Sequence, residues 1–92
     1  MAPRVAVIVL NWNGIKDTLA CLKSLSKVDY KNKETIVVDN GSTNNSVPEL
    51  KKIKGITLIC NKKNEGFAEG NNIGIRYTLK KCQYALLLNN DT

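Results

Sequence analysis

The sequence predicts an α/β fold: a Rossmann-like, three-layer α/β/α domain around a parallel sheet. Two observations predict it. Short apolar runs rich in Val, Ile and Leu recur along the 92 residues, and such runs are typical of strands buried on both faces. Longer stretches with apolar residues at steps of three and four lie between them and indicate amphipathic helices. Strands that alternate with helices pair in parallel through right-handed crossovers.

The first predicted strand is the apolar run at residues 4–10, and the polar run Asn-Trp-Asn-Gly ends it. The first predicted helix begins at residue 15, where apolar residues recur at steps of four, three and three and form one face. These residues are Ile15, Leu19, Leu22 and Leu25. A polar linker at residues 28–33 then leads into the second strand.

The second predicted strand is the β-branched run at residues 35–38, which ends at Asp39, Asn40, Gly41 and Ser42. A buried strand that delivers a carboxylate into a turn-forming loop at its carboxyl end is how open α/β sheets build ligand sites. A simple surface turn capped by Asp39 fits the same residues. The loop alone leaves both interpretations open.

A short helix, a third strand, a long helix and a fourth strand are predicted to follow. Ser46 is the expected N-cap of the short helix at residues 47–50. The strands are expected at residues 56–60 and 84–88. The face of the long helix that is turned toward the sheet is expected to carry Ala68, Asn72, Ile75, Leu79 and Cys82. Asn72 is therefore expected either to bond a neighbouring loop or to point at a ligand.

The simplest winding of these elements gives the strand order 3-2-1-4. The chain then changes direction between strands one and four, and a ligand is expected over the carboxyl ends of these strands. Four segments lie at that edge of the predicted sheet: residues 11–14, 39–43, 64–72 and 89–91. Polar and small residues are concentrated in them.

The formal net charge is +6, and lysines occur in pairs at residues 51–52, 62–63 and 80–81. Few aromatic residues lie among them, so solvated surface lysines are favoured over a patch that binds nucleic acid. We therefore expect no nucleic-acid partner. No apolar run approaches the roughly 18 residues of a membrane span, so no transmembrane segment is expected in this chain.

Three widely spaced cysteines, Cys21, Cys60 and Cys82, occur in a chain without histidine. That composition excludes the usual zinc patterns and any Cys-His nucleophile pair. Each cysteine falls within or beside an apolar stretch. We therefore expect three buried, free thiols in a reducing compartment.

The loop after the first strand limits the kind of ligand. It has one glycine, Gly14, and a bulky Trp12, which disfavours a dinucleotide site. The chain has no Gly-Lys-Ser or Gly-Lys-Thr, so it has no P-loop. A phosphoacceptor module would need acidic residues where Asn11 and Asn13 stand. A mononucleotide site remains.

In such a site Trp12 forms a wall beside a base or ribose, and Asp39 accepts a hydrogen bond from one of them. Asp91 holds a divalent cation between two phosphates, since Mg²⁺ and Mn²⁺ prefer oxygen ligands. Each residue also has a plainer interpretation. Trp12 can simply cover the edge of the sheet, and Asp91 can be a terminal residue without a ligand.

Four stretches resemble the successive motifs of family-2 glycosyltransferases with the GT-A fold. They read Val-Ile-Val-Leu-Asn-Trp-Asn-Gly, Ile-Val-Val-Asp-Asn-Gly-Ser-Thr, Asn-Glu-Gly-Phe-Ala-Glu-Gly-Asn-Asn-Ile-Gly-Ile and Leu-Leu-Leu-Asn-Asn-Asp-Thr. The motifs occur in the family's order and cover nearly the whole chain. The resemblance is nearest to the branch that includes rhamnosyltransferase-like enzymes.

The resemblance implies an inverting transfer of a sugar from a UDP- or dTDP-linked donor to the hydroxyl of a glycan or lipid-linked acceptor, in cell envelope polysaccharide biosynthesis. It implies a Mg²⁺ or Mn²⁺ cofactor bound by Asp91. The substrate-binding residues that it implies are Leu10, Asn11, Trp12, Asp39, Asn40, Gly41, Asn64, Gly66, Asn71, Asn72 and Asn90.

The sequence departs from the family's pattern in two ways. Asn89 replaces the first aspartate of the Asp-x-Asp motif, which leaves metal dependence open. The family's general base lies beyond that motif, where the acceptor half begins, and an in-line displacement needs the base. We therefore expect residues 1–92 to be one nucleotide-sugar-binding domain that is inactive alone. The resemblance implies a cytoplasmic location and leaves peripheral membrane association of the full-length protein open.

One rival class fits the same fold: a non-catalytic Rossmann-like module that binds a nucleotide or a protein.

Overall fold

The computed structural model describes residues 4–28, 30–64, 66–78, 82 and 84–88. Strands and helices alternate along the chain, as the apolar runs and helical periodicity predict. The elements are β1 (Val5–Asn11), α1 (Ile15–Ser26), β2 (Lys33–Asn40), α2 (Ser46–Lys51), β3 (Ile56–Asn61), α3 (Phe67–Thr78) and β4 (Tyr84–Leu88).

The four strands form one parallel sheet in the order β3-β2-β1-β4, which confirms the predicted topology. Register aligns the polar carboxyl ends of the inner strands. Asn11 of β1 is opposite Asp39 of β2, and Asp39 is opposite Cys60 of β3. On the other side of β1, Val9 is opposite Leu88 of β4. The residues that end each strand therefore meet at one edge of the sheet.

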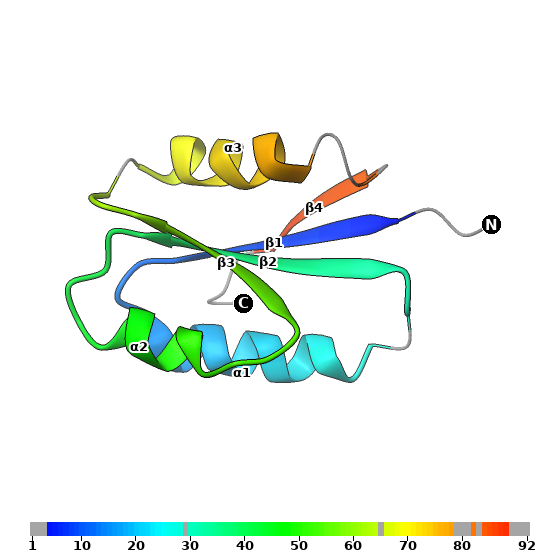
Figure 1. The fold of residues 1–92 in the computed structure, drawn as a ribbon, viewed down its shortest axis with the longest axis horizontal. Coiled ribbons are helices and arrows are strands. Elements are labelled where there is room, and N and C mark those ends of the chain that lie inside the picture. Colours follow the sequence, from blue (N-terminus) through cyan, green and yellow to red (C-terminus); the bar gives the residue numbers. More distant parts are fainter. Residues whose placement is uncertain (1–3, 29, 65, 79–81, 83, 89–92) are drawn as a thin grey trace.

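The helices form two layers: α1 and α2 cover one face of the sheet and α3 covers the other (Figure 1). Alternate strand residues pack on opposite faces. Val9 and Val37 pack with Leu22 of α1, whereas Ile8 and Val38 form the cluster on the α3 face. Burying one such side chain contributes about 1.5–3 kcal/mol. The unbroken apolar runs of β1 and β2 thus supply both halves of the core.

The second strand and the short helix differ from the predicted bounds. β2 extends to Asn40, because Asp39 and Asn40 pair with β3 and are strand residues rather than loop residues. The N-cap of α2 is Asn45, so the prediction of Ser46 is wrong. Ser46 is the first residue of the helix, fully buried, and its hydroxyl has no hydrogen-bond partner among the described residues.

The face that α3 turns to the sheet also differs from the prediction. Asn71 is buried and Asn72 is exposed, so the predicted orientation of Asn72 is wrong. Gly70 and Gly74 lie against the sheet: a Cβ on Gly70 would be 2.6 Å from a Leu10 methyl carbon. The glycines let the helix backbone approach closely. Ile75, from the predicted face, packs against the core cluster on this side of the sheet, as expected.

The end of α3 and the exposure of the three thiols also differ from the prediction. The helix ends at Thr78, so Cys82 is not part of it, and Leu79 lies outside the described residues. All three cysteines are free, as predicted, but they are not buried as a group. Cys60 is exposed on the edge strand β3, and Cys21 and Cys82 are partly buried.

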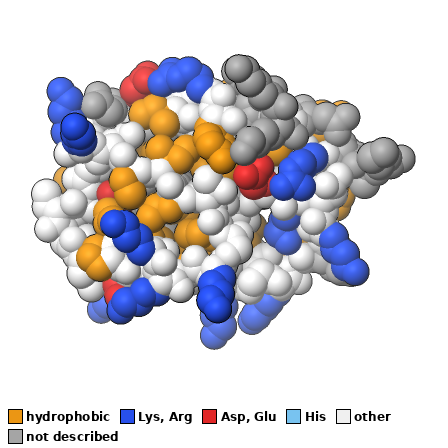
Figure 2. Space-filling view, in the orientation of Figure 1, with side chains coloured by type: hydrophobic (Ala, Val, Ile, Leu, Met, Phe, Trp, Pro, Cys, Tyr) orange, Lys and Arg blue, Asp and Glu red, His pale blue; other side chains and the backbone are white. Residues whose placement is uncertain are grey.

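The described lysine pairs at residues 51–52 and 62–63 are exposed. Lys52 forms an ion pair of 2.7 Å with Glu49 on the surface of α2. Figure 2 shows Lys and Arg side chains dispersed around the margin of one face, with hydrophobic side chains between them. Such exposed pairs contribute little to stability.

None of the helices in the described part of the chain combines the length and hydropathy that crossing a bilayer requires.

Candidate functional site

Buried polar side chains gather at the carboxyl edge of the sheet. Asn11 ends β1, and Asp39 is the last residue but one of the neighbouring strand β2; both residues are at most 1% exposed. Asn40, which ends β2, is 2% exposed. Asn71 of α3 is 5% exposed. A buried polar group without a partner costs roughly 1–3 kcal/mol, so these groups must be paired.

The Asp39 carboxylate joins β1, β2 and the loop after β2. Its Oδ1 accepts hydrogen bonds from Asn11 Nδ2 at 2.8 Å and from the Ser42 hydroxyl at 2.6 Å. Its Oδ2 accepts one from the Ser42 backbone N–H at 3.0 Å. Asn11 in turn accepts a bond from the Thr18 hydroxyl of α1 at 2.6 Å. Asp39 therefore holds the loop in place, and its contact with a base stays a prediction.

Asn13 clamps the β1–α1 loop to the β2–α2 loop. Its side-chain oxygen accepts hydrogen bonds from the backbone N–H groups of Thr43 at 2.8 Å and Asn44 at 3.2 Å. Asn44 Nδ2 donates back to the Asn13 carbonyl at 3.1 Å. Asn13 has a φ of 53°, in the left-handed region that asparagine tolerates better than most residues. The two loops therefore form one rigid unit.

A second cluster, on the α3 side, is centred on Asn40. Its Nδ2 donates to Asn64 Oδ1 and to the Gly66 carbonyl, both at 3.1 Å, and its Oδ1 accepts from Asn61 Nδ2 at 3.0 Å. The Gly66 N–H donates to Asn64 Oδ1 at 2.7 Å. The cluster fixes the loop between β3 and α3 against the end of β2.

A glycine is required at Gly41, where the loop after β2 meets the β3–α3 loop. Its φ is 79°, and a Cβ at this position would lie 2.4 Å from the Lys63 carbonyl carbon. Only a residue without a side chain fits between β2 and the β3–α3 loop.

The structure brings most of the predicted site residues together at this edge. Trp12 follows β1 and is 52% exposed. Leu10 is partly buried and lies against Gly70. Asn72 is exposed on the outer side of α3 and lies away from the buried cluster. Asn90 and Asp91 lie outside the described residues, so their place in the site stays a prediction.

Sequence reasoning did not assign roles to Asn13, Ser42, Thr18 and Asn61. Asn13 precedes a glycine, a dipeptide that marks turns, and this signal could have indicated its left-handed conformation. The partners of Thr18 and Asn61 come from other elements, so no local pattern indicates them.

The described residues alone do not form a site for a divalent cation. No group of three carboxylate or thiol ligands exists among them, and the Asp39 carboxylate already accepts three hydrogen bonds. The Cys60 thiol lies at this edge, but partial burial and then the Asp39 carboxylate raise its pKa, against a smaller opposing effect of Lys51. A raised pKa keeps the thiol protonated and weakly nucleophilic.

Comparison with known proteins matches this chain to one family. Residues 6–92 match the family model described as glycosyl transferase family 2. The chain is 32% identical over 81 residues to the dTDP-rhamnosyl transferase RfbF of Shigella flexneri, a match that covers 88% of this chain and 27% of that protein.

Solved structures share the fold. A mannosyltransferase from Pyrobaculum calidifontis, in complex with GDP-Man and Mn²⁺, superposes with a TM-score of 0.89 at 23% identity over 99% of this chain and 28% of its own. TarS residues 1–349 of S. aureus, in complex with UDP, give a TM-score of 0.84 at 23% identity over 96% of this chain and 27% of their own. This chain therefore spans little more than a quarter of each of these relatives.

Proposed function

Because this chain belongs to glycosyl transferase family 2, we propose that it is the donor-binding part of an inverting glycosyltransferase. In this proposal it binds a UDP- or dTDP-linked sugar, and the full-length protein transfers the sugar to the hydroxyl of a glycan or lipid-linked acceptor. In this proposal the enzyme acts in cell envelope polysaccharide biosynthesis and is located in the cytoplasm. The similar dTDP-rhamnosyl transferase and the UDP complex of TarS support the choice of donor.

One observation carries the proposal. Three loops follow β1, β2 and β3 and are held together by hydrogen bonds at the carboxyl edge. Asn13 joins the first loop to the second, and Asn40 joins the end of β2 to the third. Ligands of open α/β sheets bind in the crevice outside the carboxyl ends of the strands. A rigid rim of this kind is preorganised, so little conformational entropy is lost when a ligand binds.

The residues of this rim suit a nucleoside. Trp12 supplies an exposed aromatic face against which a base or ribose can pack. Gly66 leaves the backbone open to close approach of a ligand, since a Cβ at this position would meet no atom within 4 Å. The net charge of +6 favours the approach of a diphosphate.

We propose that residues 1–92 form one unit of a larger catalytic domain, which supplies the general base and binds the acceptor. The β4 strand supports this. Three large side chains on it are exposed, Tyr84 at 63%, Leu86 at 52% and Leu87 at 47%, and among the described residues only β1 pairs with it. An open apolar edge of this kind marks an interface. The unit alone is expected to bind donor without transferring sugar.

Asp91 remains the proposed ligand of Mg²⁺ or Mn²⁺, together with the phosphates of the donor. The Mn²⁺ in the similar mannosyltransferase structure supports a divalent cation. Asn89 in place of an aspartate predicts weak binding of the metal in the absence of nucleotide.

The proposal is tested by titrating isotope-labelled protein with UDP or dTDP in the presence of Mg²⁺ and following the backbone amide signals. We expect saturable shifts at Trp12, Asn13, Ser42 and Gly66, which surround the carboxyl edge. The Trp12→Ala variant should bind more weakly while its unfolding midpoint stays unchanged, because this side chain is exposed. Shifts scattered over the surface lysines, or no shifts at millimolar nucleotide, would instead support a non-catalytic module.

A further inference from the structure

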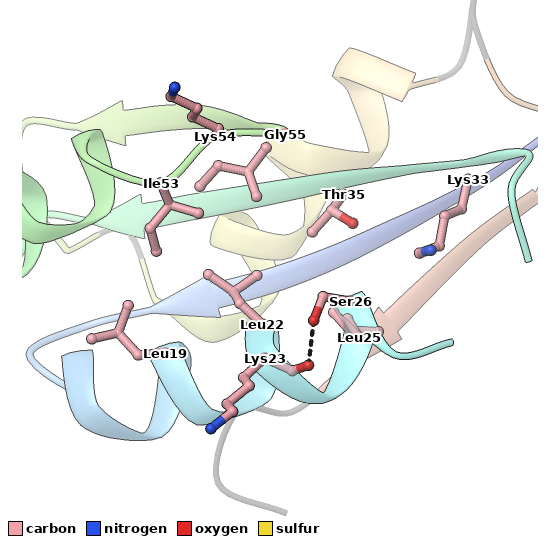
Figure 3. A pocket seen from close by; sticks show the side chains of 11 residues that line it. Leu19, Leu22, Lys23, Leu25, Ser26, Lys33, Thr35, Ile53, Lys54 and Gly55 are labelled. Atoms are coloured by element: carbon pink, nitrogen blue, oxygen red, sulfur yellow. Dashed lines mark hydrogen bonds between the residues drawn. The ribbon is translucent and has the colours of Figure 1, made fainter. Parts of the chain in front are cut away.

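An apolar groove lies on the α1 face of the sheet, at the edge opposite to the candidate site. Its volume is about 480 Å³. The floor is formed by Thr35 of β2 and Ile56 of β3, near the amino ends of these strands, and Leu22 and Leu25 of α1 form one wall (Figure 3). Ile53, in the turn after α2, lies on the other side.

The groove exists because the helical layer on this face is incomplete. The α1 helix has 12 residues and α2 has 6. At a rise of 1.5 Å per residue, α2 is about 9 Å shorter, which corresponds to about six helical residues. After α2 the chain returns to the sheet through Gly55, whose φ is 83°. The amino-terminal parts of β2 and β3 are therefore left without a helix over them.

The rim of this groove is positively charged. Lys23 of α1, Lys33 of β2 and Lys54 of the turn after α2 line it, and none of the described lining residues is acidic. Lys33 donates hydrogen bonds to the backbone carbonyls of Val28 and Tyr30, at 3.3 and 3.2 Å. Lys23 and Lys54 are exposed, and they come from different walls of the groove (Figure 3).

We propose that this groove is a docking site for an acidic amphipathic helix of a partner protein. The apolar stripe of that helix packs on Leu19, Leu25 and Ile56, and its carboxylates face Lys23 and Lys54. Such a helix completes the layer that α2 leaves open, and helices are commonly recognised by burying an apolar face in a groove.

The shape of the surface favours a helix over a lipid membrane. The apolar residues line a groove between α1 and the turn after α2, whereas membrane-surface binding buries an apolar face that protrudes into the headgroup boundary. The complementary charges would set the orientation and the rate of association more than the affinity.

The test uses the 92-residue chain and a fluorescent synthetic peptide of leucine and glutamate, with leucines at helical spacing. Binding is measured by fluorescence anisotropy at about 0.1 M salt, where the Debye length is about 10 Å. The charge-reversed Lys23→Glu/Lys54→Glu variant should weaken binding by about tenfold, because two attractive pairs become repulsive. The Leu19→Asp variant should also weaken it, since Leu19 lines the groove and is 37% exposed.

The matched control is Lys62→Glu/Lys63→Glu, which makes the same change in net charge at the opposite edge of the sheet. It should leave peptide affinity within about twofold, because charges farther away than a Debye length are largely screened. Equal weakening in the control and in the Lys23/Lys54 variant would overturn the proposal, since it would show non-specific attraction. Binding to phosphatidylglycerol vesicles without binding to the peptide would also overturn it, in favour of a membrane surface.

Discussion

Replacing Gly41 and Gly55 by alanine separates backbone strain from crowding between the loops of the site. Both glycines have nearly the same φ, 79° and 83°. A Cβ at Gly55 would meet no atom within 4 Å, whereas one at Gly41 would lie 2.4 Å from the Lys63 carbonyl carbon and 2.6 Å from the Asn64 nitrogen. The pair therefore differs in the contact alone.

The expected costs follow from these distances. The left-handed conformation costs an L-residue roughly 1–2 kcal/mol, and the lower entropy of the unfolded chain offsets about 0.4–1 kcal/mol of this. Gly55→Ala should therefore lower the free energy of unfolding by about 0.5–1 kcal/mol. At Gly41 the β3–α3 loop must also move away, which breaks the two bonds from Asn40 to Asn64 and Gly66. Each bond contributes about 0.5–1.5 kcal/mol, so Gly41→Ala should cost about 1.5–4 kcal/mol.

Urea unfolding followed by circular dichroism measures both variants. The slope of unfolding free energy against urea should stay the same, and the midpoint should fall much further for Gly41→Ala. A domain of this size is stable by about 5–14 kcal/mol, so both variants should still fold. If the two variants lose the same stability within about 0.5 kcal/mol, the Gly41 loop does not pack on the β3–α3 loop as described.

Three further predictions concern single side chains. Asp39→Ala should lower the free energy of unfolding by about 3 kcal/mol, because it removes the acceptor of three hydrogen bonds; an unchanged urea midpoint would contradict this. Ser46→Ala should be neutral or stabilising in the same assay, since the buried hydroxyl has no hydrogen-bond partner in the described part of the chain; a loss of about 1 kcal/mol would instead indicate that Ser46 caps the helix. The hydrogen bond and charge of Arg76 lower the pKa of Glu69, so an NMR titration should find a midpoint below the ordinary value, and Arg76→Gln should raise it. The stability from this pair is present above the unfolded-state pKa of Glu69 and should be lost as pH falls through the lower, folded-state value.

The strand order and the position of the candidate-site residues in the sheet could be predicted, because the alternation of strands and helices and the apolar runs are visible in the sequence. Residues 5–10 of β1 and 36–38 of β2 are apolar at every position, which is typical of central parallel strands. The residues that follow such strands must meet at one edge. Leu10, Asn11, Asp39 and Asn40 were placed correctly at that edge for this reason.

The side-chain environments could not be predicted, because they depend on residues distant in the sequence. Asp39 is buried, and its carboxylate accepts hydrogen bonds from Asn11 and Ser42. Asn11 belongs to another strand. The buried face of α3 is shifted by one position, from Asn72 to Asn71, because close contact of Gly70 with Leu10 decides how the helix lies on the sheet. Hydrophobic periodicity carries no information about a face formed by glycine.

The central claim is that the carboxyl edge of this sheet binds the nucleotide of a sugar donor, and the fluorescence of Trp12 tests it most directly. Trp12 is the only tryptophan in the sequence and is 52% exposed at that edge. Titration with UDP or dTDP should change its emission in a saturable way, beyond the inner-filter effect measured with N-acetyltryptophanamide, and equal ionic strength of phosphate should not reproduce the change. Emission that matches the N-acetyltryptophanamide control at every concentration, up to millimolar nucleotide, would contradict the account.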